Sequence, residues 1–257
     1  MKFSIITPSY NQARYLAQTL ESVASQAGNF EIEHFIMDGG STDNSVKVIK
    51  DYVSKYKKQP HLKIYWLSRP DKGQVDALNQ AIPKVTGDIV AYINSDDYYL
   101  PQAFSSVQQH FLNHPSAQWL VGNCQISDPG LSWTFWLKHL WPINYFKNAL
   151  LVFNTINQPS VFLKKDLVNE IGLFDQSLHY AFDYDYWLRC NKIMSPSRLH
   201  LSLSVFRVHP QSKGNSNFSH QFDEDWLVFI KQQPNDFLYF IHALAKNFVK
   251  FIYSFLK

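Results

Sequence analysis

The stretch that decides the fold is "AYINSDDYYLP", residues 91–101. An apolar run, residues 89–93, predicts a buried strand, and it stops abruptly at four polar residues, 94–97. Two of these, Asp96 and Asp97, are adjacent carboxylates followed by two tyrosines, a leucine and a proline. Like charges side by side repel, and a divalent cation is the obvious candidate to offset that repulsion.

The residues around this stretch alternate between strand and helix patterns. Short apolar runs predict strands, and apolar residues at helical spacing predict the helices between them. The predicted strands are residues 3–8 (ended by Pro8), 32–38, 62–68 and 88–94, and the predicted helices are residues 16–23, 46–56, 74–82 and 104–111. This alternation predicts a mainly parallel α/β sheet covered on both faces. Ligands of such sheets bind beyond the carboxyl ends of the strands, so Asp38 and Asp96 should both point into that crevice.

The second half of the chain is less regular. It predicts a strand and a short helix ending at Gly172, a helix with Asp183, Asp185 and Arg189, and a late strand ending in His209. A separate amphipathic helix begins at Asp236. We predict a main domain over residues 1–220 and a helical tail over residues 221–257.

Composition excludes several classes of protein. Of 257 residues, 46% are apolar and 18% charged, which allows a packed core and argues against disorder. The net charge of +3 is too small for a dedicated nucleic-acid binder. No secretory signal and no run of about 20 apolar residues is evident. Two cysteines without metal spacing, Cys124 and Cys190, indicate buried thiols in a reducing cytoplasm.

The sequence contains no GxGxxG and no GxxxxGK[ST] motif, so neither a dinucleotide-binding site nor a P-loop is favoured. A metal held by carboxylates is the remaining common way to hold phosphates.

Four stretches, in this order and spacing, resemble the GT-A domain of family 2 glycosyltransferases. They are "SIITPSYNQARYLAQTLESVASQ" (4–26), "DGGSTDNS" (38–45), "RPDKGQVDALNQAIPKVTGDIVAYINSDD" (69–97) and "LP" (100–101). The resemblance covers roughly residues 3–215, and its specific part lies in the first hundred residues. It is greatest to bacterial transferases that build surface polysaccharides such as O-antigen, capsule or colanic acid.

The resemblance implies a nucleotide-binding set. It assigns Asp38 to the base, for which a turn or helix-cap role is the alternative. It places the remaining contacts at Thr7, Pro8, Tyr10, Asp71, Lys72, Asn94 and Ser95. Asn94 stands where the family usually has an acid that contacts the ribose. Pro8 and Tyr10 also suit turn and core positions, and Lys72 also suits a solvated surface.

The resemblance also implies a site for Mg²⁺ or Mn²⁺. Asp96 matches the metal ligand of the family's DxD motif, with Asp97 as its support, and His209 completes the site or touches the diphosphate. The alternatives are a β-turn over residues 94–97 and a structural histidine. Lys213 would neutralise charge on the leaving group.

Inverting transferases need a base that takes the proton of the acceptor hydroxyl. The resemblance assigns this role to Asp183, although Phe182 replaces the glutamate that usually precedes it. Asp185 is the rival base, and an N-cap is the structural alternative for Asp183. The QxxRW motif of processive members is absent, which favours transfer of one sugar per encounter.

The tail from Asp236 carries a broad apolar face and a narrower basic stripe. This pattern is typical of a helix in a membrane interface, and docking on the protein is the alternative. A tryptophan-rich segment, residues 133–141, is a second candidate contact with a bilayer, an acceptor pocket or core.

Together these observations predict a metal-dependent, inverting glycosyltransferase. Its donor would be a nucleoside-diphosphate sugar, with UDP favoured. Its acceptor would be a glycan, lipid-linked, reached from the cytoplasm at the inner face of the membrane. A non-catalytic sugar- or nucleotide-binding module with a decayed site is the alternative, supported by Asn94 and Phe182. A nucleotidyltransferase would show a Gly-rich loop after the first strand, which this chain lacks.

Overall fold

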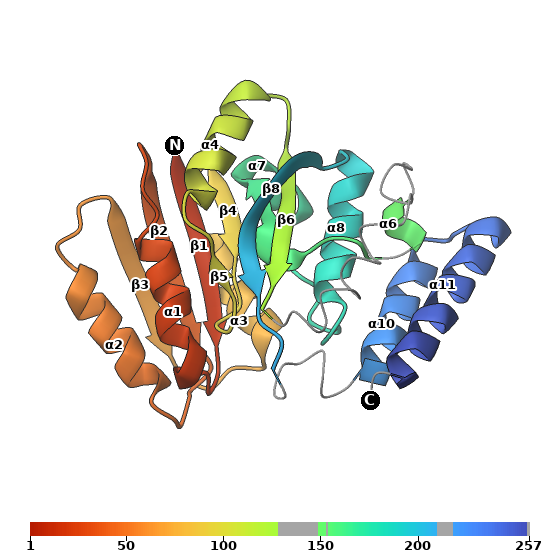
Figure 1. The fold of residues 1–257 in the computed structure, drawn as a ribbon, viewed down its shortest axis with the longest axis horizontal. Helices are drawn as coiled ribbons and strands as arrows, with labels where there is room; N and C mark the ends of the chain where they lie inside the picture. Colours follow the sequence, from red (N-terminus) through yellow and green to blue (C-terminus); the bar gives the residue numbers. More distant parts are fainter. Residues whose placement is uncertain (128–148, 153, 210–217, 256–257) are drawn as a thin grey trace.

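The computed structural model describes residues 1–127, 149–152, 154–209 and 218–255 (Figure 1). The strands are β1 Lys2–Ser9, β2 Glu31–Asp38, β3 Leu62–Ser68, β4 Ile89–Tyr92, β5 Tyr98–Tyr99, β6 Trp119–Ile126, β7 Val161–Lys164 and β8 Ser197–Phe206. The helices are α1 Ala13–Ala24, α2 Ser45–Tyr56, α3 Gln74–Ala81, α4 Ala103–Asn113, α6 Ala149–Val152, α7 Lys165–Ile171, α8 Phe182–Ile193, α10 Phe218–Lys231 and α11 Asp236–Phe255. Two 3₁₀ turns, η1 Ile82–Lys84 and η4 Gln158–Ser160, complete the described elements. The tryptophan-rich segment and Lys213 lie outside the described residues.

The strands form one sheet in the order β3-β2-β1-β4-β7-β6-β8-β5. The first four strands are parallel and form the predicted α/β half. In the other half, β7 is antiparallel to both β4 and β6, β8 is parallel to β6, and β5 is antiparallel to β8. The sheet is therefore mixed, with its parallel part at the amino-terminal half of the chain.

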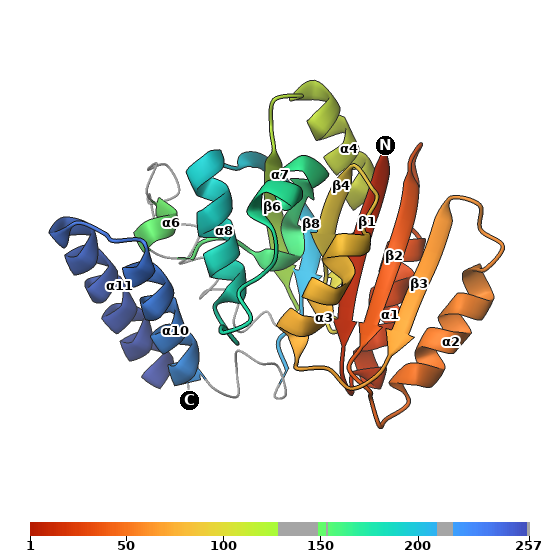
Figure 2. The same cartoon turned by 180° about the vertical axis from the view of Figure 1, so that it is seen from behind.

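Helices cover both faces of the sheet, and each face has its own apolar core. On one face α1, α2 and α4 pack on β1 and β2, with Phe3, Leu20 and Phe104 among the fully buried residues (Figure 1). On the other face α3, α7 and α8 surround Leu78 and Trp187 (Figure 2). The alternation of inward side chains along β1 and β2 supplies both cores, because successive residues of a strand face opposite sides.

Two strand ends differ from the predictions, and backbone hydrogen bonding explains both. Strand β1 continues through Pro8 to Ser9. The carbonyl of Ile6 points toward β4, where it accepts the N–H of Ile93. The backbone nitrogen of Pro8, two residues on, points to the same side. It lies beyond the last residue pair of β1 and β4, so the strand loses no hydrogen bond through the missing N–H of proline. Strand β8 ends at Phe206, three residues before His209, because the N–H of Arg207 donates to a side chain, Asp97, instead of a strand.

The link between β4 and β5 shows that the sheet curls. Only residues 93–97 separate the two strands, yet β7, β6 and β8 lie between them in the sheet order. Strand β5 returns against α1, where the N–H of Tyr99 donates to Ser22 Oγ over 3.1 Å. The mixed half of the sheet therefore bends back toward the parallel half, and residues 94–97 join the two.

The last two helices, α10 and α11, lie side by side as a pair at one end of the molecule (Figures 1 and 2). The ring of His242 on α11 stacks on Phe229 of α10 with centroids 3.9 Å apart. His242 Nδ1 also lies 3.0 Å from the carbonyl of Leu151 on α6. One face of α11 is therefore docked on the protein.

Candidate active site

The turn after β4 lies at the carboxyl ends of the parallel strands. The N–H of Asp97 donates to the carbonyl of Asn94 over 3.0 Å, so the residues form the β-turn that the sequence offered as one reading. Helix α1 fixes this turn, because Thr19 Oγ1 lies 2.8 Å from the carbonyl of Ser95 and 2.6 Å from that of Asp97. Ser95 itself is buried.

Asp97 points inward and is fully buried. Its Oδ1 accepts the backbone N–H of Arg207 over 2.9 Å, and its Oδ2 lies 3.4 Å from Asn94 Nδ2. Burial raises the pKa of Asp97 well above its ordinary value, and the charge of Asp96 raises it further. Its oxygens are thus directed at the protein, which is the geometry of a support for Asp96.

Asp96 faces the crevice beside His209. Asp96 Oδ2 lies 3.0 Å from His209 Nε2, and the two side chains are 18% and 6% exposed. The ring of Tyr15 packs against His209 with centroids 4.5 Å apart. Arg207 Nη1 donates to the backbone carbonyl of Asp96 over 2.5 Å, which anchors the residue from the opposite side. The structure therefore brings together Asp96 and His209 of the predicted metal site, and Asp97 is directed into the protein.

Asp96 and His209 fit a divalent cation that takes most of its coordination from a bound phosphate group and from water. Within the part of the chain that the structure describes, no three His, Cys, Asp or Glu side chains form a metal-binding group. The protein offers one carboxylate oxygen of Asp96 and one imidazole nitrogen of His209. Mn²⁺ accepts both donor types, and Mg²⁺ usually takes one or two protein ligands plus phosphate oxygens and water.

Asn94 lies in a chain of amide hydrogen bonds that sequence reasoning missed. Gln74 Nε2 donates to Asn94 Oδ1 over 2.6 Å, and Asn94 Nδ2 lies 3.3 Å from Gln158 Oε1. Gln158 Nε2 donates in turn to the carbonyl of Tyr92 over 2.8 Å. These contacts use both a donor and an acceptor of residue 94, so an amide suits the position better than a carboxylate does. No local pattern marks Gln158, which is brought in by the fold.

Asp38, at the end of β2, organises the loop that follows it. Its Oδ2 accepts the N–H of Ser41 over 3.0 Å and the hydroxyl of Ser68 over 2.6 Å, and Oδ1 accepts the Ser41 hydroxyl. Gly40 adopts φ +81° with the Pro70 nitrogen 2.9 Å from where a Cβ would lie. Asp38 thus makes the contacts expected of a turn-forming residue, which was the alternative to a nucleotide-binding role. Its contact with the base stays a prediction.

Asp71 lies directly against this loop. Its carboxylate oxygens are 3.0 Å from the place of a Cβ on Gly39, and Oδ1 accepts the N–H of Gly73 over 2.8 Å. Burial raises the pKa of Asp71, and the charges of Asp76 and Asp38 add to the rise, against the Gly73 hydrogen bond. Lys72 is exposed and makes no ion pair with any described residue.

The three candidates on β1 and just after it face different ways. Thr7 is fully buried, and its Oγ1 lies 2.9 Å from His34 Nε2 in the core. Pro8 is also buried. Tyr10 is 60% exposed, so of the three its side chain is the accessible one. Their role around the base stays a prediction.

The two acids at the start of α8 have different surroundings. Asp183 is partly exposed, and its Oδ1 accepts the N–H of Tyr184 over 2.7 Å. Asp185 is buried and pairs with Arg189 Nε over 2.9 Å. Arg189 also donates to the carbonyl of Ile171, so Asp185 belongs to a structural network. Asp183 is therefore the more accessible of the two acids, and its role as the base stays a prediction.

Tyr92 connects Asp183 with the turn after β4. Its hydroxyl is buried and has no hydrogen-bond partner among the described residues. Burial raises the pKa of this phenol well above its ordinary value, and the charges of Asp183 and then Asp97 raise it further. The Asp183 and Asp97 carboxylates therefore both act on the same buried phenol.

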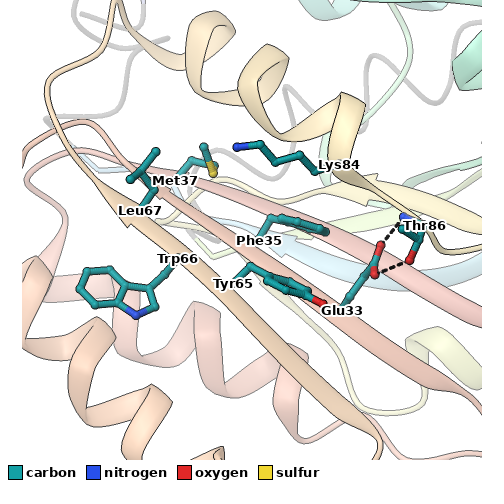
Figure 3. Close-up of a pocket in the computed structure, with 8 residues that line it drawn as sticks. All are labelled: Glu33, Phe35, Met37, Tyr65, Trp66, Leu67, Lys84 and Thr86. Atoms are coloured by element: carbon teal, nitrogen blue, oxygen red, sulfur yellow. Dashed lines mark hydrogen bonds between the residues drawn. The ribbon is translucent and has the colours of Figure 1, made fainter.

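A separate hollow of about 320 Å³ lies along β2 and β3 (Figure 3). In Figure 3 the Glu33 carboxylate points to Thr86 at one end of it. The rest of the lining comes from Phe35, Met37, Tyr65, Trp66, Leu67 and Lys84. None of the predicted site residues lines this hollow.

The mixed sheet with helices on both faces is a GT-A fold, which solved glycosyltransferase structures share. The model of the family described as glycosyl transferase family 2 matches residues 4–166, which is more than half of the chain. The chain belongs to glycosyl transferase family 2 and is a glycosyltransferase by family.

Known proteins agree with this assignment. An uncharacterized glycosyltransferase of Rickettsia typhi is 26% identical over 239 residues, which cover 89% of this chain and 71% of the relative. The poly(ribitol-phosphate) beta-N-acetylglucosaminyltransferase TarS of Staphylococcus aureus is 31% identical over 115 residues, covering 43% of this chain and 19% of TarS. This chain therefore spans only a part of these relatives.

Solved structures show the same fold. TarS 1–349 in complex with UDP-GlcNAc matches with a TM-score of 0.65 and 18% identity, covering 89% of this chain and 66% of that one. The mannosyltransferase PcManGT of Pyrobaculum calidifontis, in complex with GDP-Man and Mn²⁺, matches with a TM-score of 0.63 and 17% identity, covering 95% and 68%.

Proposed function

We propose that this chain transfers one sugar from a nucleoside-diphosphate sugar, with UDP favoured, to a hydroxyl of a glycan acceptor, with inversion. The contact that carries the proposal is Asp96 Oδ2 to His209 Nε2, 3.0 Å apart at the carboxyl end of the parallel strands. Ligands of open α/β sheets bind at that end. The donor in the TarS complex, UDP-GlcNAc, supports the choice of UDP.

Asp96 and His209 would hold Mg²⁺ or Mn²⁺ together with the diphosphate of the donor. Bound there, the cation would offset negative charge on the departing diphosphate. The protein's own part is to hold Asp96 in place through Arg207 and the buried Asp97. The PcManGT complex, which contains Mn²⁺, supports this part of the proposal.

Asp183 would act as the general base. The acceptor oxygen forms a bond to the anomeric carbon, the bond from that carbon to the diphosphate oxygen breaks, and the acceptor proton moves to the Asp183 carboxylate. Asp183 is the partly exposed acid of α8, whereas Asp185 is engaged by Arg189.

The acceptor would be a lipid-linked or growing surface glycan, reached at the inner face of the cytoplasmic membrane. The free buried cysteines suit the cytoplasm, and TarS is named for a polymer acceptor. The face of α11 turned away from the protein exposes Phe237, Phe240 and Leu244 by 70%, 60% and 52%. Such a face suits the interface of a bilayer. Among the described residues, no helix has the length and apolar character to cross a membrane.

A thermal-shift panel of UDP, GDP, dTDP and CMP, each with and without Mn²⁺, tests donor and metal together. One diphosphate should stabilise the protein only with Mn²⁺, by about 2.7 kcal/mol at 100 times its dissociation constant. Asp96→Ala should abolish this shift, and Asp166→Ala, an exposed acid on α7, should preserve it. A folded sample that no nucleotide stabilises would contradict the donor site and favour a decayed binding module.

The base is tested by Asp183→Asn. Turnover should fall by roughly 10²–10⁴ while donor binding persists, because the loss falls on proton transfer. Loss of donor binding in a folded variant would remove Asp183 from this role.

Flotation with vesicles that contain anionic lipid tests the membrane contact. The double variant Phe237→Ser/Phe240→Ser should no longer float, whereas Leu112→Ser, which removes a leucine 61% exposed on α4, should behave as wild type. Equal flotation of both variants would contradict a contact through α11.

A further inference from the structure

A carboxylate from the C-terminal helices binds the segment that leads into α8. Glu224 on α10 accepts three successive backbone N–H groups. Its Oε2 lies 2.9 Å from His179 N, 2.6 Å from Tyr180 N and 2.9 Å from Ala181 N. Its Oε1 lies 3.1 Å from His179 N as well. Hydrogen bonds to a charged acceptor are among the stronger ones in proteins, and one carboxylate here unites three of them.

These three residues immediately precede the proposed base. Ala181 is the N-cap of α8, and its carbonyl accepts the first helical N–H, from Asp185, over 3.0 Å. Asp183 lies two residues further on, and its carboxylate accepts the N–H of Tyr184. A negative charge is favourable at a helix N-terminus. Glu224 therefore fixes where α8 begins, and with it the position of Asp183 along the crevice.

Helix α10 is packed against the rest of the protein, which holds Glu224 in place. Val228 and Phe229 of α10 are fully buried. Lys231 Nζ lies 3.2 Å from Asp175 Oδ2, which ties the end of α10 to the loop before α8. The His242 ring of α11 stacks on Phe229 and links the second helix to this support.

We propose that Glu224 is a positioning residue for the base Asp183, and that α10 is a working part of the catalytic unit. This inference rests on the proposed function. Misplacement of a reacting group by about 1 Å can cost about 10²-fold in rate. Loss of Glu224 should therefore act on turnover and leave the nucleotide site, which α10 does not form, unaffected.

The test compares Glu224→Ala, Glu224→Gln and the control Glu170→Ala, which removes an exposed glutamate from α7. The full chain is assayed for release of UDP from UDP-N-acetylglucosamine with Mn²⁺, and hydrogen exchange is followed at the amides of residues 179–181. Glu224→Ala should lower kcat by about 10–100-fold with KM and UDP affinity within twofold of wild type. Exchange at these amides should rise. Glu224→Gln keeps one acceptor oxygen and should recover part of kcat.

Four outcomes separate the two proposals. If Glu224→Ala has the same kcat as Glu170→Ala while Asp183→Asn is impaired, the role of Glu224 is overturned and the proposed function is not. Unchanged exchange at residues 179–181 would also overturn it. Wild-type turnover in Asp183→Asn, or no release of UDP by the wild-type chain, would overturn the proposed function and this inference with it.

Discussion

Glu33 carries the prediction with the best-defined magnitude. It lies in β2, in the half of the strand away from the active site, and its side chain is 1% exposed. Lys2 Nζ lies 2.6 Å from Oε2, and Ser4 Oγ donates over 2.5 Å to Oε1. The Thr86 hydroxyl donates over 2.7 Å to Oε2 (Figure 3). Burial alone would raise the pKa of Glu33, but the hydrogen bonds from Lys2, Ser4 and Thr86 lower it from 4.5 to about 2.

The gap between 4.5 and about 2 corresponds to about 3 kcal/mol, because one pKa unit is worth about 1.4 kcal/mol. The pKa in the folded state lies below that in the unfolded state. The ionised Glu33 therefore contributes its full stabilisation above about pH 4.5, and this contribution is lost as the pH falls toward about 2.

Urea unfolding of wild type and Glu33→Gln between pH 7 and pH 3 measures the effect. The difference in free energy of unfolding between the two proteins should shrink by about 2 kcal/mol over this range. Glu31→Gln, an exposed change in the same strand, should show no such trend. A difference between wild type and Glu33→Gln that does not depend on pH would refute the reasoning.

Three further predictions concern the crevice. Gly40→Ala should destabilise the protein by about 1 kcal/mol or more, because φ +81° is costly for alanine. The melting temperature should therefore fall. An unchanged melting temperature would contradict this. If His209 shares the cation with Asp96, His209→Ala should weaken Mn²⁺-dependent nucleotide binding about 10-fold or more. Nucleotide binding without metal should be unchanged. Titration calorimetry measures both affinities. Asn94→Asp should lower the free energy of unfolding in urea by about 1–3 kcal/mol, because a carboxylate would replace the amide 3.4 Å from Asp97. A free energy of unfolding equal to that of wild type would exclude this contact as stabilising.

The parallel half of the fold follows closely from local sequence patterns. The apolar run at residues 62–68 became β3 with the same bounds, and the periodic segment at 74–82 became α3, Gln74–Ala81. In this half β2 pairs with its chain neighbours β1 and β3, β4 adds on the other side of β1, and helices of ordinary length join the strands. Hydrophobic periodicity is then sufficient, because packing and local preference agree.

The mixed half follows less well, because its contacts are distant in sequence. Strands β5 and β6 were not predicted, and α10 was predicted only as part of a helical tail over residues 221–257. The site depends on the same distant contacts: Arg207 meets Asp97 across 110 residues, and Glu224 meets Ala181 across 43. Candidates such as Asp96 could be recognised from motifs, whereas Gln158, Tyr92 and Glu224 have no local signature. Only the fold brings these side chains close to the candidate site residues.

The curl of the sheet has a consequence for how the chain acquires its activity during folding. The family motifs lie within residues 4–166, but the backbone N–H that binds Asp97 and the imidazole that meets Asp96 follow β8. Closing a loop of more than 100 residues is entropically costly and comes late unless other contacts precede it. A nascent chain can therefore complete the parallel strands, with the motifs of the first hundred residues in place, before Arg207 and His209 can reach Asp97 and Asp96. Under the proposed function, activity would begin only after β8 has been synthesised and has joined the sheet.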